Sequence, residues 1–162
     1  MEFSKKYFTK AEELLAINPD GIFMSPGPGN PQDVPEIIDN VKKLIGKKPI
    51  FGICMGIQLI SIALGAKTFK LPFGHRGSNH PVKDLRTGRV YITSQNHGYA
   101  VSDEGLPNDI EVILRSVNDG TIEGIKHKTL PIQAIQYHPE AAPGPTDNLY
   151  LFKEFTKMME DN

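Results

Sequence analysis

The only cysteine of the chain, Cys54, lies in a Gly-x-Cys-x-Gly pattern at residues 52–56. A predicted buried strand precedes the cysteine and a predicted helix follows it, so the two glycines permit a sharp turn that presents the sulfur at the end of the strand. The positive end of the following helix favours the thiolate, which is the nucleophilic form. The backbone N–H of Met55 is free at that helix end and can stabilise a developing oxyanion. The pattern therefore predicts a nucleophilic cysteine.

His138 and Glu140 are the candidate partners of Cys54, and both follow a predicted strand at residues 132–137. Side chains at the carboxyl ends of parallel strands meet at one edge of a sheet. A histidine there can take the thiol proton, and a carboxylate can hold the imidazole in the required tautomer. Taken singly, Cys54 fits a small buried hydrophobe and the His-Pro-Glu sequence fits a surface turn, but together the three residues form a Cys-His-Glu triad.

The surrounding sequence predicts the elements that would position this triad. Short apolar runs bounded by turn residues indicate buried strands, and apolar residues at helical spacing indicate amphipathic helices. The predicted strands are residues 21–25, 49–54 and 132–137, and the predicted helices are one capped at Thr9 with Glu12 as its capping box, then residues 35–45, 57–64 and 151–159. This alternation indicates an α/β fold with a mostly parallel central sheet and helices on both faces.

The middle of the chain has a different pattern, typical of a small antiparallel β region. Turn residues at 87–88 and 119–120 separate runs rich in β-branched residues, and Asp119 followed by Gly120 is a strong hairpin signal. The predicted strands of this region are residues 82–85, 89–95, 110–118 and 121–127.

Composition excludes several classes of protein. With 18 Lys and Arg against 19 Asp and Glu, the net charge of −1 lacks the basic surplus of a nucleic-acid binder. No apolar run approaches the roughly 18 residues of a membrane span. One cysteine excludes an internal disulfide and favours the reducing cytoplasm. His75 and His80 have no cysteine or carboxylate cluster beside them in the sequence, so we expect no metal site.

Several sequence blocks carry a resemblance to a known family. Residues 52–58 (GICMGIQ) and 136–140 (QYHPE) resemble the class I, or triad, glutamine amidotransferases. Within that family the chain is similar to the C-terminal glutaminase domain of the small subunits of carbamoyl-phosphate synthases. The blocks that carry this closer resemblance are residues 25–31 (SPGPGNP), 73–82 (FGHRGSNHPV), 94–101 (SQNHGYAV) and 138–145 (HPEAAPGP).

The resemblance implies a flavodoxin-like fold and a glutaminase activity. Cys54 would attack the carboxamide of L-glutamine and form a γ-glutamyl thioester, while His138 acts as base and then acid and Glu140 orients it. The oxyanion would be held by the N–H groups of Met55 and of Gly27 or Gly29. The residues implied to contact glutamine or the oxyanion are Gly27, Gly29, Met55, Gln58, Asn96, Gly98 and Tyr99.

The same resemblance implies a division of labour between two chains. Ammonia would pass to the carbamoyl-phosphate synthase large subunit, which would use ATP, Mg²⁺ and bicarbonate to make carbamoyl phosphate for arginine and pyrimidine synthesis. This chain has no P-loop pattern, so we expect it to need no cofactor of its own.

The chain departs from the family at its start. We expect residues 1–162 to form a single glutaminase domain that is incomplete at its N-terminus, because the family's domain opens with a strand and a helix for which residues 1–8 are too short. Two alternatives remain: a glutaminase that serves another synthetase, such as those for anthranilate or guanylate, and a truncated homologue without catalytic activity.

Overall fold

The computed structural model describes residues 9–140 and 148–162. The Pro-Gly-Pro sequence at residues 143–145 therefore lies outside the described residues. The elements, in chain order, are α1 (Ala11–Ala16), β1 (Ile22–Met24), the short 3₁₀ helix η1 (Pro31–Asp33), α2 (Pro35–Leu44), β2 (Ile50–Ile53), α3 (Met55–Ala63), β3 (Thr68–Asp84), β4 (Val90–Val101), β5 (Ile110–Ser116), β6 (Ile122–His127), β7 (Ile132–Ile135) and α4 (Tyr150–Glu160).

Within the described residues these strands form one sheet of seven, in the order β1-β2-β7-β6-β5-β3-β4. β1, β2 and β7 run parallel, which confirms the α/β fold. The antiparallel part is larger than the small region expected, because β6, β5, β3 and β4 extend the same sheet beyond β7. Only residues 128–131 connect β6 to β7, and a parallel crossover needs a dozen residues or more, so the two strands pair antiparallel.

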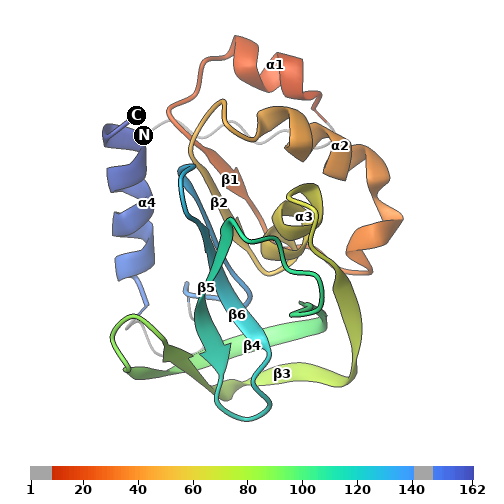
Figure 1. Ribbon diagram of the computed structural model, residues 1–162, viewed down its shortest axis with the longest axis vertical. Coiled ribbons are helices and arrows are strands. Elements are labelled where there is room, and N and C mark those ends of the chain that lie inside the picture. Colours follow the sequence, from red (N-terminus) through yellow and green to blue (C-terminus); the bar gives the residue numbers. More distant parts are fainter. Residues whose placement is uncertain (1–8, 141–147) are drawn as a thin grey trace.

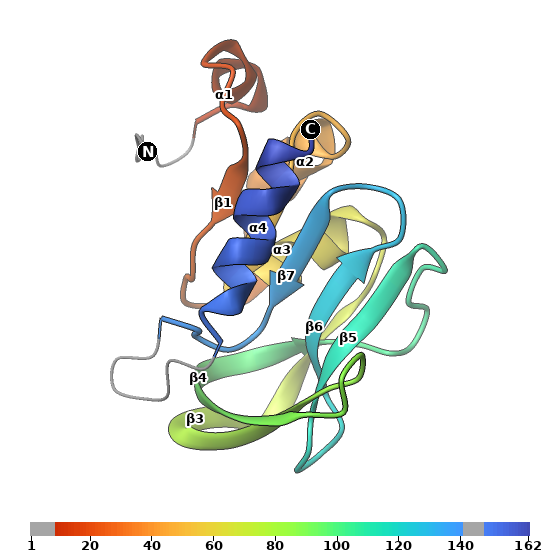
Figure 2. The ribbon, with the colours of Figure 1, turned by 90° about the vertical axis from the view of Figure 1, so that its left-hand side faces the viewer.

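Helices cover both faces of the parallel strands (Figures 1 and 2). On one face, α2 and α3 bury Val41, Leu44, Ile57 and Ile60 against Ile50 of β2. On the other face, α4 buries Leu151 and Phe155, and the ring of Phe155 stacks on that of Phe51 with 5.4 Å between centroids. The central parallel strands β2 and β7 are therefore buried on both faces, as is typical of parallel strands.

The capping box predicted at Thr9 is wrong. Helix α1 begins at Ala11 after Lys10, and the side chain of Lys10 makes no capping hydrogen bond. Instead, Asn40 of α2 accepts a hydrogen bond from the N–H of Ala11 at 3.1 Å, so a partner distant in the sequence satisfies the helix end.

The long hairpin of β3 and β4 crosses one end of the molecule (Figure 1). The sequence predicted only the end of β3, because Pro72, Gly74 and Gly77 are untypical of a strand. Two register shifts, between Lys70 and His75 and between Gly77 and His80, accommodate these residues as bulges. An isolated bridge between Ser94 of β4 and His138 then brings β4 beside the carboxyl end of β7.

Among the described residues, the structure has no helix of the length and apolar character needed to cross a membrane.

Candidate active site

Cys54 occupies the sharp turn between β2 and α3. Its φ of 55° and ψ of −106° are uncommon for a residue other than glycine, and a conformation of this kind costs about 1–3 kcal/mol, which the surrounding structure must hold. The N–H of Cys54 donates to Ile135 O of β7 at 2.9 Å, which ties the turn to the sheet. The predicted nucleophile elbow is thus the observed local structure, with Cys54 at the N-cap of α3.

The two glycines of the elbow are required by close packing. A Cβ on Gly52 would lie 2.6 Å from Ile60 Cδ1 and 2.8 Å from the carbonyl carbon of Gly56. A Cβ on Gly56 would lie 2.6 Å from the carbonyl oxygen of Met24 in β1. The absence of both side chains lets α3 start directly against β1 and β2.

His138 lies beside Cys54, and Glu140 lies beside His138. His138 Nδ1 is 3.1 Å from Glu140 Oε1, which leaves Nε2 for the thiol, and the N–H of His138 donates to Ser94 O at 2.9 Å. Hydrogen bonding with Cys54, and then with Glu140, raises the pKa of His138 to about 10. The hydrogen bond with His138 in turn lowers the pKa of Glu140. The geometry therefore favours an imidazolium between a carboxylate and the sulfur.

A pocket of about 400 Å³ opens over Cys54 and His138. The structure brings all of the predicted site residues to its wall except Met55 and Glu140, which do not line it. Met55 supports the loop after β1, because a Cβ on Gly27 would lie 3.1 Å from Met55 Sδ. The residues that line the pocket are Pro26, Gly27, Pro28, Gly29, Cys54, Gln58, Arg76, Asn96, His97, Gly98, Tyr99 and His138.

The resemblance implied that Gln58 contacts glutamine, and the structure shows that the side chain also makes hydrogen bonds within the pocket wall. Its amide donates one hydrogen bond to Tyr99 O at 2.8 Å and another to Gln136 Oε1 at 3.0 Å. Both N–H groups of the amide are therefore used within the protein. The carbonyl oxygen of Gln58 remains as the acceptor that the amide can offer to a ligand.

Sequence reasoning missed two residues of this pocket, His97 and Arg76. His97 is 7% exposed, and burial lowers its pKa to about 4. Its position between Asn96 and Gly98, both predicted, was the available signal. The guanidinium of Arg76 donates to Phe73 O at 2.7 Å and lines the pocket as a cation that a substrate carboxylate could use.

In the described part of the chain, one cluster of possible metal ligands includes His97 of the pocket wall. Atoms of His75, His97 and Glu123 lie within 4.8 Å of one another. The fold brings Glu123 to histidines that are distant from it in the sequence. The expectation of no metal site stays a prediction.

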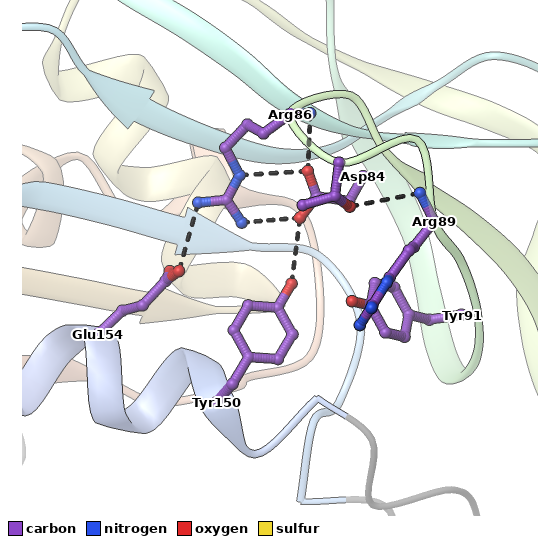
Figure 3. A pocket seen from close by; sticks show the side chains of 7 residues that line it. Asp84, Arg86, Arg89, Tyr91, Tyr150 and Glu154 are labelled. Atoms are coloured by element: carbon purple, nitrogen blue, oxygen red, sulfur yellow. Dashed lines mark hydrogen bonds and ion pairs between the residues drawn. The ribbon is translucent and has the colours of Figure 1, made fainter.

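A larger pocket, of about 720 Å³, lies elsewhere, between the β3–β4 turn and α4 (Figure 3). It contains none of the predicted site residues, and its charged groups mainly pair with one another. Arg86 donates to Asp84 Oδ2 at 2.8 Å and lies 3.4 Å from Glu154 of α4. Size alone would favour this larger pocket as the active site, but the predicted nucleophile Cys54 and the predicted base His138 line the smaller one.

A nucleophile elbow with a cysteine, a paired histidine and glutamate, and this mixed α/β sheet together define a class of amide-hydrolysing domain. The model of the family "Glutamine amidotransferase class-I" matches residues 4–158, and the chain belongs to that family. The curated relatives that it matches belong to one narrower group within that family. It is 62% identical over 151 residues to the carbamoyl phosphate synthase small chain of Akkermansia muciniphila and 59% identical over 151 residues to that of Clostridium perfringens.

These matches cover 93% of this chain, but 41% and 43% of the two relatives. The chain thus spans about two fifths of the length of the relatives it matches. Among solved structures, it is similar to a protein from Thermoplasma acidophilum described as one subunit of a GMP synthase, with a TM-score of 0.79, 26% identity, and 94% of this chain and 77% of that chain covered. A glutamine amidotransferase from Thermotoga maritima shares the fold, with a TM-score of 0.61 and 17% identity over 86% of this chain and 64% of that chain.

Proposed function

We propose that this chain is the glutaminase part of a carbamoyl phosphate synthase small chain, which hydrolyses L-glutamine to glutamate and ammonia. The observation that carries the proposal is Cys54 on its strained elbow, next to His138 in the wall of a pocket, with Glu140 hydrogen-bonded to His138. The identities to carbamoyl phosphate synthase small chains support the choice of synthase.

The proposed reaction has two halves. The thiolate of Cys54 attacks the side-chain carboxamide carbon of glutamine, and the N–H of Met55 with that of Gly27 or Gly29 stabilises the oxyanion. The C–N bond then breaks as His138 gives its proton to the leaving nitrogen, which departs as ammonia and leaves a γ-glutamyl thioester. His138 next removes a proton from water, the hydroxide attacks the thioester carbon, and glutamate leaves as Cys54 is regenerated.

The pocket offers complementary groups for the amino-acid end of glutamine. The carbonyl oxygen of Gln58 suits the ammonium group, and the guanidinium of Arg76 suits the carboxylate. Asn96, Gly98 and Tyr99 on β4 provide further polar groups along the pocket wall. Gly27 and Gly29 let the backbone of the loop after β1 approach the substrate closely.

The proposal extends to a partner. Ammonia would pass to a carbamoyl phosphate synthase large chain, where ATP and Mg²⁺ would drive the synthesis of carbamoyl phosphate for arginine and pyrimidine synthesis. We place the reaction in the cytoplasm, where a reducing environment keeps a nucleophilic thiol free. This chain would need no cofactor for its own half of the reaction.

Glutamate release with and without a large chain tests the activity. We expect the parent chain to release glutamate, Cys54→Ser to release none above background, and mass spectrometry of the parent quenched in acid to find a γ-glutamyl group on Cys54. Equal release by parent and variant, even in the presence of the large chain, would rule out the catalytic role.

The second candidate is a glutaminase of another amidotransferase, which the likeness to the GMP synthase protein favours. Pull-down with purified large chain of carbamoyl phosphate synthase, and with the synthetase subunit of GMP synthase, separates the two. Binding only to the second of these would reverse our choice of synthase without affecting the glutaminase step.

A further inference from the structure

Gln136, which follows β7 directly, is a buried glutamine that none of the catalytic steps above uses. It is 0% exposed, and its backbone N–H donates to Glu123 O of β6 at 2.9 Å. Its side chain reaches α3, where its Oε1 accepts a hydrogen bond from the amide of Gln58 at 3.0 Å. Because Gln58 lines the pocket over Cys54, Gln136 links the end of β7 to the pocket wall from behind.

The hydrogen bonds determine which end of each amide is the nitrogen. The carbonyl oxygen of Tyr99 can only accept, so the end of the Gln58 amide that lies 2.8 Å from it is the nitrogen. That nitrogen also lies 3.0 Å from the Gln136 amide, so the Gln136 atom that faces it is the oxygen. Both N–H groups of Gln58 are therefore held inside the protein.

The carbonyl oxygen of Gln58 faces the pocket instead. No group within the described residues donates to it, and it is not one of the buried side-chain atoms that lack a partner there, so part of its surface must be accessible. Gln58 as a whole is only 3% exposed, and the open space that it lines is the pocket at Cys54 and His138. The two bonds on the nitrogen thus direct an acceptor into that space.

The other end of the Gln136 amide has no such use. Its nitrogen is buried and has no hydrogen-bond partner within the described residues. Unpaired buried donors destabilise a protein, and a methionine of similar length at this position would avoid them. The oxygen of Gln136, which holds Gln58, is therefore a better explanation for the amide than stability is.

We propose that Gln136 is a positioning residue that holds the Gln58 amide with its oxygen toward the pocket, where this oxygen selects ligands that carry an α-ammonium group. The step from the Gln58 oxygen to the ammonium group of glutamine rests on the proposed function. Without the acceptor on Gln136, the Gln58 amide keeps only its bond to Tyr99 O, so its oxygen is no longer held toward the ligand.

Binding of two ligands to Cys54→Ser, which we expect to bind without hydrolysis, tests this selectivity. The ligands are L-glutamine and 4-carbamoylbutanoate, which is glutamine without its α-amino group. In this background we expect Gln136→Met to weaken glutamine binding about tenfold, the equivalent of one hydrogen bond to a charged group. The affinity for 4-carbamoylbutanoate should stay within about twofold. Calorimetric titration measures both.

Gln133→Met is the matched control. Gln133 is also a buried glutamine, 3% exposed on β7, but it donates to Glu154 of α4 and does not line the pocket. Its substitution should leave both affinities within about twofold. Gln136→Glu is the second variant, because it keeps an oxygen for Gln58, and it should retain the selectivity within about threefold. A melt followed by circular dichroism checks that each variant folds.

Gln58→Met shows whether Gln136 acts through Gln58. In the Gln58→Met background, Gln136→Met should not change the ratio of the two affinities further, because the acceptor that Gln136 holds is already gone.

The side-chain amide signals of the five glutamines provide a readout that needs no ligand. We expect the amide hydrogens of Gln58, assigned by their loss in Gln58→Met, to exchange with solvent more slowly than those of the exposed Gln32. In Gln136→Met they should exchange about tenfold faster than in the parent. If Gln136→Met does not fold, Gln136→Glu and the exchange in the parent decide the proposal.

Four results would overturn the proposal. They are an equal loss of affinity for both ligands in Gln136→Met, a further loss of selectivity in the Gln58→Met background, a loss of selectivity in folded Gln136→Glu, and fast exchange of the Gln58 amide in the parent. A chain that binds neither ligand would instead contradict the proposed function, and the exchange of the Gln58 amide would still show whether Gln136 holds it.

Discussion

His138, the proposed catalytic base, has a protonation state that two neighbours determine. Contacts with Cys54 and Glu140 raise its pKa to about 10, so the imidazolium persists well above neutral pH. That form is the one that can give a proton to departing ammonia. Glu140 contributes from a partly solvated position, because half of its side chain is exposed, so water can replace part of its effect.

The first prediction concerns Glu140→Gln. One of the two contacts that raise the pKa of His138 is lost, so the pH at which activity falls on the alkaline side should move from about 10 to a lower value. The turnover number at pH 8 should fall by roughly 10²-fold, less than the about 10⁴-fold for a buried carboxylate in serine proteases, since Glu140 is half exposed. Initial rates of glutamate release from pH 6 to 11 measure both. An unchanged alkaline limb would show that Glu140 does not act on His138.

At the scale of elements, the junction of β1, β2 and α3 determines where the sulfur lies. Gly52 and Gly56 allow the start of α3 to touch both strands, and this contact holds Cys54 in its strained conformation. The position of the Cys54 sulfur is therefore a consequence of backbone packing as well as of side-chain choice.

Gly56→Ala tests this junction. The new methyl group would overlap the carbonyl oxygen of Met24, a backbone atom that cannot move aside cheaply, so we expect a loss of unfolding free energy of about 1–3 kcal/mol and a large fall in turnover. Thermal and urea melts measure the first, and glutamate release measures the second.

Gly98→Ala is the matched control for stability, because its Cβ would meet only Arg76 Nη2, at 4.0 Å. Equal melting points for the two variants would contradict the packing argument.

The elements differ in how well the sequence predicts them, for physical reasons. The elbow was predictable because the strand, the cysteine and the start of the helix are contiguous in the sequence. The three parallel strands were predictable because each is a short apolar run. The first part of β3 was not, because its prolines and glycines are accommodated only by bulges against β4. Arg76 was missed because only the pairing of β3 with β4, which sets Arg76 opposite Asn96, brings it to the pocket, and no local pattern records that contact.

Across the whole molecule, a cluster of charged side chains connects the antiparallel strands to helix α4. Asp84 is 1% exposed at the end of β3, and its carboxylate accepts from Arg86 and, at 3.3 Å, from the Tyr150 hydroxyl of α4. Arg86 also reaches Glu154 of the same helix (Figure 3). Burial alone would raise the pKa of Asp84, but the bonds from Arg86 outweigh it and lower that pKa.

Arg86→Leu should therefore loosen this contact by leaving Asp84 buried without its cation. Because Arg86 is 30% exposed, we expect a loss of about 2 kcal/mol, below the roughly 3–5 kcal/mol for a fully buried pair. A carboxyl whose folded pKa is lowered stabilises the fold above its unfolded pKa of about 3.9, and this contribution is lost as the pH falls through the folded pKa. The difference between parent and variant should thus be full at pH 7 and narrow below about pH 4. Urea melts across that range measure it, with Arg89→Leu as control, since Arg89 lines the same pocket but makes no ion pair within the described residues. A difference that stays constant from pH 7 to pH 3 would show that Arg86 contributes by packing rather than by charge.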